Sequence, residues 1–328
     1  MRAFVVSDLD GQLTLTTTEV EPHASDSDDV LVKVDFSGVN YKDALVAMAE
    51  SRVRRVPSLV GGVDAAGVIT QSPDPNLTVG TRVAVHGGNL GVGRDGGFAQ
   101  YVYAPARFIN VLPDSVSTHD AMVIGTAGFS AMASVLALES HGLAPGAEVL
   151  VTGATGGVGS LAITFLAARG YSAVASTGSP QESSWLEERG ATRVIGRDEI
   201  SDKPDRVLAS ERWAGAIDCI GGDTLHHILR SLRYGAAVAS SGLVAGTDLT
   251  TSIYPFITRA VSLLGIDAVE ATASTRSRVW TALGQIAHQV DLAPLVDREV
   301  SLGHVADALE IVRKGETRGR ILVNPTSG

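Results

Sequence analysis

The segment from Val149 to Gly159 constrains the fold of this chain more than any other. It reads VLVTGATGGVG, a short apolar strand that runs directly into a glycine-rich turn. The turn glycines recur every third residue, which allows a tight turn, close approach of a pyrophosphate to the backbone and close packing of the next helix on the strand. N–H groups at the start of that helix attract anions. A tight turn without a ligand would show the same glycines, but the sequence favours a dinucleotide phosphate site at Thr155, Gly156, Gly157 and Val158.

The residues after this turn complete a βαβ unit. Apolar side chains recur with helical spacing between Ser160 and Arg169, and Gly170 stands where helices commonly end. A second strand is predicted at Ser172–Thr177. Strand, turn, helix and strand together take up about 30 residues, as a nucleotide-binding half requires. The predicted fold class is therefore α/β, with a doubly wound parallel Rossmann sheet.

The end of the second strand indicates which dinucleotide binds. Sites selective for NAD usually place an Asp or Glu there to accept hydrogen bonds from the ribose 2′-hydroxyl. This chain has Thr177, Gly178 and Ser179 instead, so no carboxylate repels a 2′-phosphate and hydroxyl groups are available to donate to one. Arg197, after the expected third strand, is the candidate positive partner, although a solvated loop arginine is an equally simple interpretation. NADPH is the expected cofactor.

Composition limits the number of domains, the binding partners and the cellular compartment that are compatible with this sequence. With 328 residues the chain is long enough for two cores, and its net charge of −10 argues against a nucleic-acid or anionic-membrane surface. Cys219 is the only cysteine, which excludes an intrachain disulfide and a zinc site built from several thiolates, and its apolar neighbours predict a buried thiol. The N-terminus lacks the pattern of a signal peptide, and no uncharged apolar stretch is long enough to span a bilayer. A cytoplasmic enzyme is expected, with no nucleic-acid and no membrane partner.

Strand and helix patterns divide the chain into two domains. Short strands separated by glycine turns predominate before residue 120, whereas strands alternate with helices from 121 to 267. The tail from 268 to 328 carries two helices and two strands and is expected to complete the first module. The prediction is a dinucleotide-binding domain at 121–267, inserted into a mostly β catalytic domain formed by 1–120 and 268–328. The active site is expected in the cleft between the two domains.

Five segments, in this order and spacing, make the chain resemble a known superfamily. They are GVNYKDAL at 38–45, IGTAGFSAM at 124–132, the glycine-rich turn, WAGAID at 213–218 and Gly319-Arg320. Over essentially its full length the chain is similar to the medium-chain dehydrogenase/reductase superfamily. Within it, the chain resembles the zinc-free quinone oxidoreductase group and the NADPH-dependent acrylyl-CoA reductases. The resemblance implies a GroES-like catalytic domain that carries the inserted Rossmann domain.

Zinc-dependent members of this superfamily carry metal ligands at two places where this chain has none. Neither the Gly38–Asp43 segment nor the Gly61–Asp64 segment contains a cysteine or a histidine, so the resemblance implies no metal site. Hydride transfer to an isolated ketone usually needs a Lewis acid or a proton donor for the charge that builds on oxygen. Hydride addition to an activated C=C bond produces a delocalised enolate, which hydrogen-bond donors can hold. Asp64, in an apolar glycine-rich stretch, is interpreted as a buried turn residue rather than a base.

The resemblance also implies roles for individual residues. Tyr41 is expected beside the nicotinamide, where its hydroxyl donates to the enolate or relays a proton, unless it only packs on the ring. Asn40 and Asp43 are expected to orient Tyr41, or else simply to cap backbone groups. The nicotinamide end of the cofactor is expected to contact Thr126, Leu243 and Ile257. Helix capping by the first and core packing by the last are the alternatives.

Three further features bear on ligand binding. At Ser179 the acrylyl-CoA reductases tend to carry Arg or Lys, so NADPH selectivity in this chain relies on Arg197 and on the absent carboxylate. Arg52, Arg54 and Arg55 form a small cluster that would meet the phosphates of CoA. The loop from Gly87 to Gly97 contains six glycines and is expected to act as a cleft wall or a lid, or as a plain linker.

The function predicted from these residues is NADPH-dependent reduction of a short enoyl-CoA, acrylyl-CoA to propanoyl-CoA. Hydride goes to the β-carbon, and no metal takes part. One alternative is a quinone or enone reductase with the same site. The other is a catalytically silent NADPH-binding relative, against which the retained Tyr41 and the intact phosphate turn argue. A homodimer is expected, formed at the edge strand Ser262–Ile266.

Overall fold

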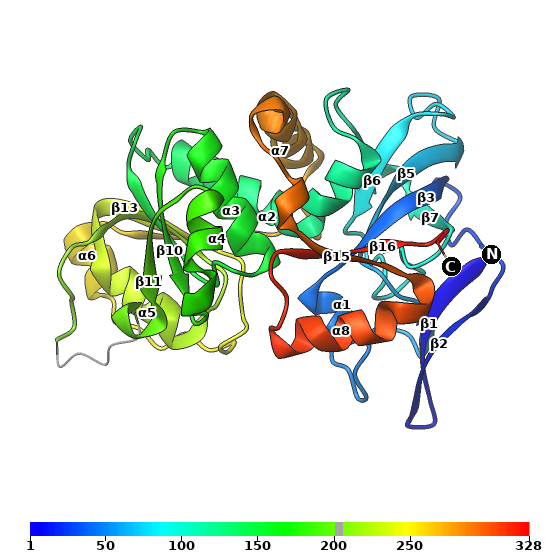
Figure 1. Ribbon diagram of the computed structural model, residues 1–328, viewed down its shortest axis with the longest axis horizontal. Helices are drawn as coiled ribbons and strands as arrows, with labels where there is room; N and C mark the ends of the chain where they lie inside the picture. The colour runs from blue at the N-terminus through cyan, green and yellow to red at the C-terminus, as the bar shows by residue number, and fades with distance from the viewer. Residues whose placement is uncertain (201–205, 328) are drawn as a thin grey trace. The chain divides into compact units, whose positions relative to one another are not determined.

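A computed structural model of the chain describes residues 1–200 and 206–327 (Figure 1). The chain forms two compact units: unit 1 is Met1–Phe129 with Ala268–Gly328, and unit 2 is Ser130–Asp267. The sequence predicts a first boundary after residue 120, whereas the division falls after Phe129. The reason is helix α2 (Thr118–Ser140), whose first half bonds to residues of unit 1: the Val123 carbonyl accepts from Arg320, and Thr126 donates to Asp64.

Unit 1 contains two sheets. A three-stranded sheet has the order β2-β1-β4, with both pairs antiparallel. A seven-stranded sheet has the order β15-β16-β3-β5-β6-β8, with β7 paired to β3 off this path, and its pairs are antiparallel except for β15 with β16. The strands of unit 1 are β1 (Arg2–Leu9), β2 (Gln12–Glu19), β3 (Asp29–Val39), β4 (Ser58–Val60), β5 (Asp64–Gln71), β6 (Arg82–His86), β7 (Tyr101–Pro105), β8 (Ile109–Val111), β15 (Val296–Ser301) and β16 (Arg320–Asn324).

Three further helices belong to unit 1: α1 (Tyr41–Val46), α7 (Ala273–Ile286) and α8 (Val305–Lys314). Alternating valines of β3 are buried against β5 and β6, which forms one core of the unit. A second core lies under α8, where Val305 and Leu309 pack with Phe4 and Phe98. Helix α1 packs against α8, so these two helices hold the Asn40–Asp43 segment in place.

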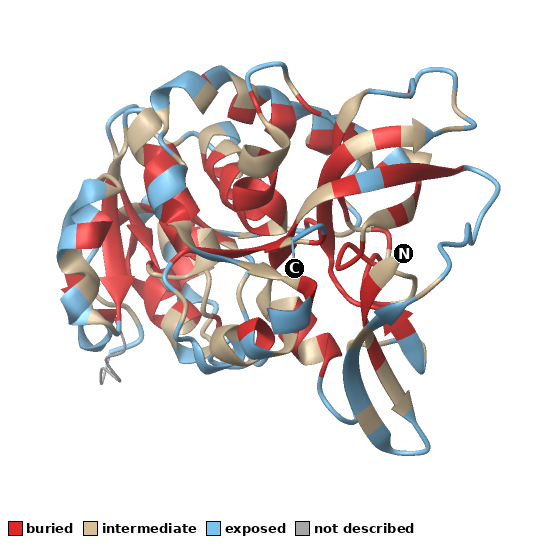
Figure 2. Cartoon of the chain, turned by 45° about the vertical axis from the view of Figure 1, so that its right-hand side comes forward, coloured by how far each residue is buried: buried red, intermediate tan, exposed pale blue. Residues whose placement is uncertain are grey.

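Unit 2 is a six-stranded parallel sheet of the Rossmann type, in the order β11-β10-β9-β12-β13-β14. Its inner strands are continuous apolar runs, as expected for a parallel sheet covered on both faces, and Figure 2 shows them as buried. The elements of unit 2 are β9 (Glu148–Val151), α3 (Gly157–Ala168), β10 (Ser172–Thr177), α4 (Ser183–Glu188), β11 (Ala191–Gly196), β12 (Trp213–Asp218), α5 (Gly222–Ser231), β13 (Leu232–Ser240), α6 (Tyr254–Arg259) and β14 (Ser262–Gly265).

Helix α2 is longer than the sequence predicts. The sequence from Ala127 to Leu138 predicts a helix, but α2 is longer, running from Thr118 to Ser140 with a non-helical residue, Gly125, in its interior. The expectation that no uncharged apolar stretch is long enough to span a bilayer is wrong for this helix, because its length and hydropathy match those of a membrane span. However, 78% of its most apolar window is buried inside the protein, which makes it a core helix. The backbone of Gly125 has φ = 48°, a conformation that favours glycine. The break places Thr126 at the start of the second half of the helix.

Candidate functional site

The centre of the site in unit 1 is the carboxylate of Asp64, which is completely buried. Its Oδ2 accepts hydrogen bonds from the Asn40 side chain at 2.8 Å and from the Thr126 backbone N–H at 3.0 Å. Its Oδ1 accepts one from the Thr126 hydroxyl. Asp64 is the first residue of β5, so the interpretation as a turn residue is wrong. It is a strand residue whose side chain collects donors from three segments of unit 1.

Arg320 supplies the positive charge beside Asp64. The guanidinium is 3% exposed; its Nη2 lies 3.5 Å from Asp64 Oδ2, and its Nη1 donates to Asn40 Oδ1 at 3.0 Å. It also donates to two backbone carbonyls, so most of its donors are used. Two glycines make room for the Asp64 and Arg320 side chains. A Cβ on Gly38 would lie 2.6 Å from Arg320 Nη2, and a Cβ on Gly125 would lie 2.5 Å from Asp64 Oδ2. The ion pair therefore fits this packing because both positions lack a Cβ.

Asn40 and Asp43 form a reciprocal capping box at the start of α1. Asp43 Oδ2 accepts from the Asn40 N–H and Oδ1 from the Val63 N–H, both at 2.8 Å. Burial and, to a lesser extent, the nearby Asp64 carboxylate together raise the pKa of Asp43 to about 7, although these hydrogen bonds oppose the shift. The capping alternative named from the sequence is thus present. Asn40 additionally bridges the Asp64–Arg320 pair to α1.

Tyr41 is the first residue of α1 and is half-buried. In the part of the chain that the structure describes, its hydroxyl has no hydrogen-bond partner. The pKa of Arg313 on α8 is raised, mainly by its hydrogen-bonded neighbour Glu310 and also by Tyr41, so the phenol lies near α8. The hydroxyl is therefore available to a ligand, while the expected contact with nicotinamide remains a prediction.

Beside this cluster lies a pocket of about 160 Å³ within unit 1. Thr126 and Val63 line it, together with three basic side chains, Lys42, Arg52 and Arg55. Within residues 1–200 and 206–327, no carboxylate forms an ion pair with any of these three. Arg55 donates to the Asn89 side chain at 2.8 Å. The pocket thus combines an uncompensated positive wall with the polar Asp64 cluster.

Of the arginines expected to meet the phosphates of CoA, Arg52 and Arg55 line this pocket, whereas Arg54 does not. Arg54 forms an ion pair with Asp8 and donates to two carbonyls at the end of α1, so it belongs to the framework of unit 1 and not to the pocket. No signal in the sequence connects residues 8 and 54; the pairing follows from the position of β1. Two of the three arginines remain as candidate ligands for an anion.

The loop from Gly87 to Gly97 forms a wall of this pocket and is not built as a lid. Its backbone is hydrogen-bonded to the neighbouring segments, for example from the Gly96 N–H to the Val60 carbonyl at 2.8 Å and from the Arg55 N–H to the Val92 carbonyl at 2.8 Å. A Cβ on Gly96 would lie 2.2 Å from the carbonyl oxygen of Gly62. The glycines therefore serve close packing of backbone on backbone.

In unit 2 the glycine-rich turn adopts the geometry of a phosphate site. Gly153 has φ = 59°, and a Cβ on Gly159 would lie 2.3 Å from the Gly153 carbonyl oxygen. Helix α3 begins after Gly156, so the N–H groups of Gly157 and Val158 in its first turn have no acceptor within the helix. Thr155 is half-buried at the turn. The structure brings together the four residues predicted to bind a pyrophosphate, and that role stays a prediction.

The residues predicted to bind a 2′-phosphate also lie together. A Cβ on Gly178 would lie 2.3 Å from the guanidinium carbon of Arg197, so this side chain rests on the backbone at the end of β10. Arg197 is exposed, and in the described residues no carboxylate pairs with it. Thr177 is buried, and its hydroxyl accepts from the Ser179 N–H at 3.0 Å. A positive charge and two hydroxyls therefore gather where the second strand ends.

Leu243 and Ile257 are exposed, at 49% and 69% of their surface. Core packing therefore does not account for Ile257, whereas the neighbouring Phe256 packs against the core of unit 2. Cys219, which the sequence predicts to be buried, is half-buried and directly follows β12, which ends at Asp218. Burial raises the pKa of its thiol, which makes it a poor nucleophile.

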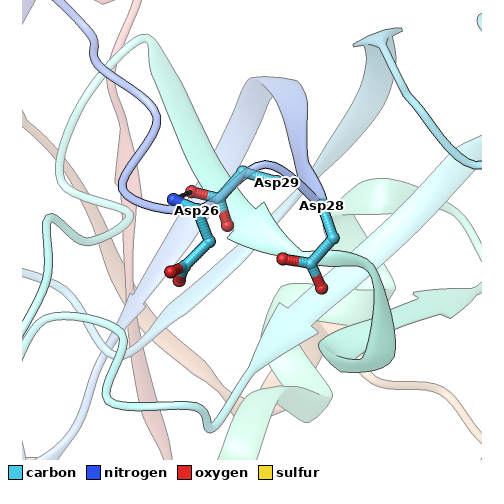
Figure 3. Close-up of side chains that lie close together, drawn as sticks. All are labelled: Asp26, Asp28 and Asp29. Atoms are coloured by element: carbon cyan, nitrogen blue, oxygen red, sulfur yellow. Dashed lines mark hydrogen bonds between the residues drawn. The ribbon is translucent and has the colours of Figure 1, made fainter.

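A zinc ion does not fit the residues of the Asp64 cluster. Its carboxylate is already neutralised by Arg320, and no cysteine or histidine stands at the two segments where zinc-dependent relatives hold the metal. Within the described residues one acidic group has the spacing of metal ligands: Asp26, Asp28 and Asp29 (Figure 3). Asp29 Oδ2 accepts from the Ser25 and Asp26 N–H groups and pairs with Arg94 at 2.6 Å. This carboxylate closes a turn.

A GroES-like unit that carries an inserted six-stranded Rossmann sheet defines a medium-chain dehydrogenase/reductase, and comparison with known proteins agrees. Residues 26–114 match the family described as alcohol dehydrogenase GroES-like domain, and residues 157–285 match the one described as zinc-binding dehydrogenase. "Putative quinone oxidoreductase YhfP" of Bacillus subtilis is 43% identical over 90% of each chain, and the acrylyl-CoA reductase AcuI of Ruegeria pomeroyi is 40% identical over 90% of each.

Comparison with solved structures indicates the same superfamily. The structure of YhdH from E. coli K-12 with bound NADPH superimposes with a TM-score of 0.90, at 34% identity over 98% of this chain and 99% of that one. The structure of Bacillus subtilis yhfP with NAD bound has a TM-score of 0.93, at 39% identity over 98% of each chain. The chain belongs to the quinone oxidoreductase and acrylyl-CoA reductase group of the medium-chain dehydrogenase/reductase superfamily. It is therefore an oxidoreductase.

Proposed function

We propose that this protein reduces the activated C=C bond of a short enoyl-CoA such as acrylyl-CoA, with NADPH as the reductant. The observation that carries the proposal is the basic wall of the pocket in unit 1, formed by Lys42, Arg52 and Arg55. A quinone or a simple enone has no anionic group that could pair with these three cations. Coenzyme A has phosphates, which bind such side chains through charge-assisted hydrogen bonds.

The cofactor assignment is supported by unit 2. The N–H groups at the start of α3 suit the pyrophosphate, and Arg197 with Ser179 suits a 2′-phosphate. Among relatives, YhdH was crystallised with NADPH and yhfP with NAD, so the preference depends on residues that this chain carries itself. The absence of a carboxylate at positions 177–179 favours NADPH.

When bound, the reduced nicotinamide supplies a hydride to the β-carbon of the substrate. The chain's own contribution is to hold the thioester and the charge that develops on its carbonyl oxygen. We assign donation to that oxygen, or relay of a proton to the α-carbon, to the Tyr41 hydroxyl, with Asn40 and Asp43 fixing the start of α1 beneath it. Thr126 contributes a polar atom to the pocket whose orientation Asp64 fixes.

Assays on the purified protein test the proposal. NADPH oxidation with acrylyl-CoA is compared with the same reaction on 1,4-benzoquinone, for the unaltered chain and for the double variant Arg52→Gln/Arg55→Gln. We expect efficient thioester reduction, and a KM for acrylyl-CoA that rises about tenfold in the double variant while the KM for the quinone stays constant. Arg107→Gln, an exposed arginine of unit 1 outside this pocket, is the matched control.

The other outcomes select other functions. Turnover of the quinone alone would identify a quinone reductase, and saturable NADPH binding without turnover would identify a silent relative. A KM for acrylyl-CoA that ignores both arginines would remove the argument from the basic wall. The proposal also includes a cytoplasmic homodimer. The free edge of β14, with Leu263 at 38% exposure, supports the dimer, and sedimentation equilibrium of the full chain tests it.

A further inference from the structure

The carboxylate of Asp218 connects the ends of three neighbouring strands in unit 2. Asp218 is the last residue of β12 and is completely buried. Its oxygens accept hydrogen bonds from the Thr152 hydroxyl at 2.9 Å, the Gly221 N–H at 3.0 Å and the Ser240 hydroxyl at 3.1 Å. Thr152 directly follows β9, and Ser240 ends β13. One side chain therefore joins the carboxyl ends of β9, β12 and β13.

On one side this network fixes the phosphate turn. The Thr152 hydroxyl donates to Asp218 and accepts from the Cys219 N–H at 3.0 Å, so it ties the residue before Gly153 to the connection after β12. A Cβ on Gly153 would lie 3.0 Å from the Ile220 side chain. The turn thus rests directly on that connection, and its position depends on Asp218.

On the other side the network fixes the loop that carries Leu243. The Ser241 N–H donates to the Asp218 carbonyl at 3.0 Å, and the Ala245 N–H donates to the Ile220 carbonyl at 2.9 Å. A Cβ on Gly242 would lie 1.8 Å from the carbonyl carbon of Cys219, so the two backbones are in direct contact. Both loops are anchored to the same end of β12.

The charge on Asp218 has no cationic partner among residues 1–200 and 206–327. Burial raises the pKa of its carboxyl, whereas the hydrogen bonds from Thr152, the backbone and Ser240 lower it. A buried carboxylate is costly unless it is well hydrogen-bonded, and an asparagine of the same shape would avoid that cost. Asparagine offers one oxygen as acceptor, however, and its NH₂ group would face donors. The arrangement of donors requires two acceptor oxygens.

We propose that Asp218 is a positioning residue for the dinucleotide, which sets the spacing between the phosphate turn and the Leu243 loop. This inference rests on the proposal that unit 2 binds NADPH, but not on the identity of the acyl substrate. Asp218 acts through the two loops and touches no reacting atom. Its loss therefore weakens the binding of a ligand that needs both loops, and spares a ligand that uses only the end of β10.

The test compares two ligands in the full-length protein. NADPH needs the phosphate turn, whereas adenosine 2′-monophosphate carries only the adenosine and 2′-phosphate portion. For Asp218→Asn we expect the Kd of NADPH to rise at least tenfold, while the Ki of adenosine 2′-monophosphate changes less than twofold. Thr152→Val and Ser240→Ala, which each remove one hydroxyl, are expected to weaken NADPH binding about threefold. They provide the test if Asp218→Asn fails to fold.

Thr164→Val is the matched control, because Thr164 is also buried in unit 2 but its hydroxyl donates only to the Ser160 carbonyl within α3. It should leave both constants unchanged. Equal weakening of both ligands, or unchanged NADPH binding in all three network variants, would overturn the inference. Tight NADPH binding by the unaltered chain without reduction of any acyl or quinone substrate would refute the proposed function and leave this role of Asp218 in place.

Discussion

Thr126 directs its backbone N–H to one oxygen of the Asp64 carboxylate and its hydroxyl to the other. The hydroxyl proton and the N–H of Thr126 are thereby both committed to Asp64. The contact with the nicotinamide end of the cofactor that the resemblance implies for Thr126 stays a prediction.

Replacing Thr126 by valine should weaken the protein measurably. The change removes a hydrogen bond to an ionised and buried carboxylate, which is worth about 2 kcal/mol. Thr126→Ser keeps the hydroxyl and should retain most of that stability. Urea unfolding of the two variants and the unaltered chain gives the difference, and equal stability of the valine and serine variants would show that the hydroxyl contributes nothing.

The buried ion pair makes a stronger prediction. Arg320→Met leaves the charge of Asp64 buried without a cation, and removing one partner of such a pair typically costs about 3–5 kcal/mol. The double variant Asp64→Asn/Arg320→Met removes both charges while an amide still accepts from Thr126. We expect it to recover much of the loss in free energy of unfolding. A double variant that is less stable than the single one would contradict this account.

The local elements were readable from the sequence because their signals are local. The strand predicted at Ser172–Thr177 is β10, and the glycine-rich turn leads into α3, although the helix starts three residues earlier than predicted, at Gly157. Here the apolar spacing and the turn glycines decide the structure within about 30 residues. The Rossmann fold and the GroES-like unit follow from such segments taken in order.

The polar cluster of unit 1 was not readable in the same way. Asp64 and Arg320 are brought together by sheet order, since β3 lies between β16 and β5. A carboxylate in an apolar run signals that a buried partner exists, but the sequence does not say which of many arginines provides it. The same limit applies to Arg54, whose partner Asp8 comes from the first strand of the chain.

Stability should fall with rising pH through the titration of Asp43. Burial raises the pKa of this carboxyl to about 7 in the folded chain, from an ordinary value of 3.8. Between these values the folded state holds a proton that the unfolded state has lost, so its contribution to stability is present at low pH and is lost as the pH rises from about 4 to about 7. Asp43→Asn does not titrate and lacks this slope.

The measurement is the free energy of unfolding of the unaltered chain minus that of Asp43→Asn, as a function of pH. We expect this difference to fall by a few kcal/mol across the window, since each pKa unit corresponds to about 1.4 kcal/mol. A flat curve would mean that the Asp43 carboxyl of the folded chain is ionised throughout this window.

The contact between Arg197 and Gly178 predicts how the chain distinguishes its cofactors. A guanidinium resting on the backbone beside Ser179 meets a 2′-phosphate but gains nothing from a 2′-hydroxyl. Arg197→Ala should therefore raise the KM for NADPH about tenfold and leave the KM for NADH nearly unchanged. Arg193→Ala, on the adjacent strand and paired with Glu148, is the control and should affect the KM for neither cofactor.

A basic residue at position 179, as the acrylyl-CoA reductases tend to carry, would also meet the charge of the 2′-phosphate. Ser179→Arg should therefore restore NADPH binding to the Arg197→Ala variant. Equal loss of both cofactors, or no rescue by Ser179→Arg, would place the 2′-phosphate elsewhere.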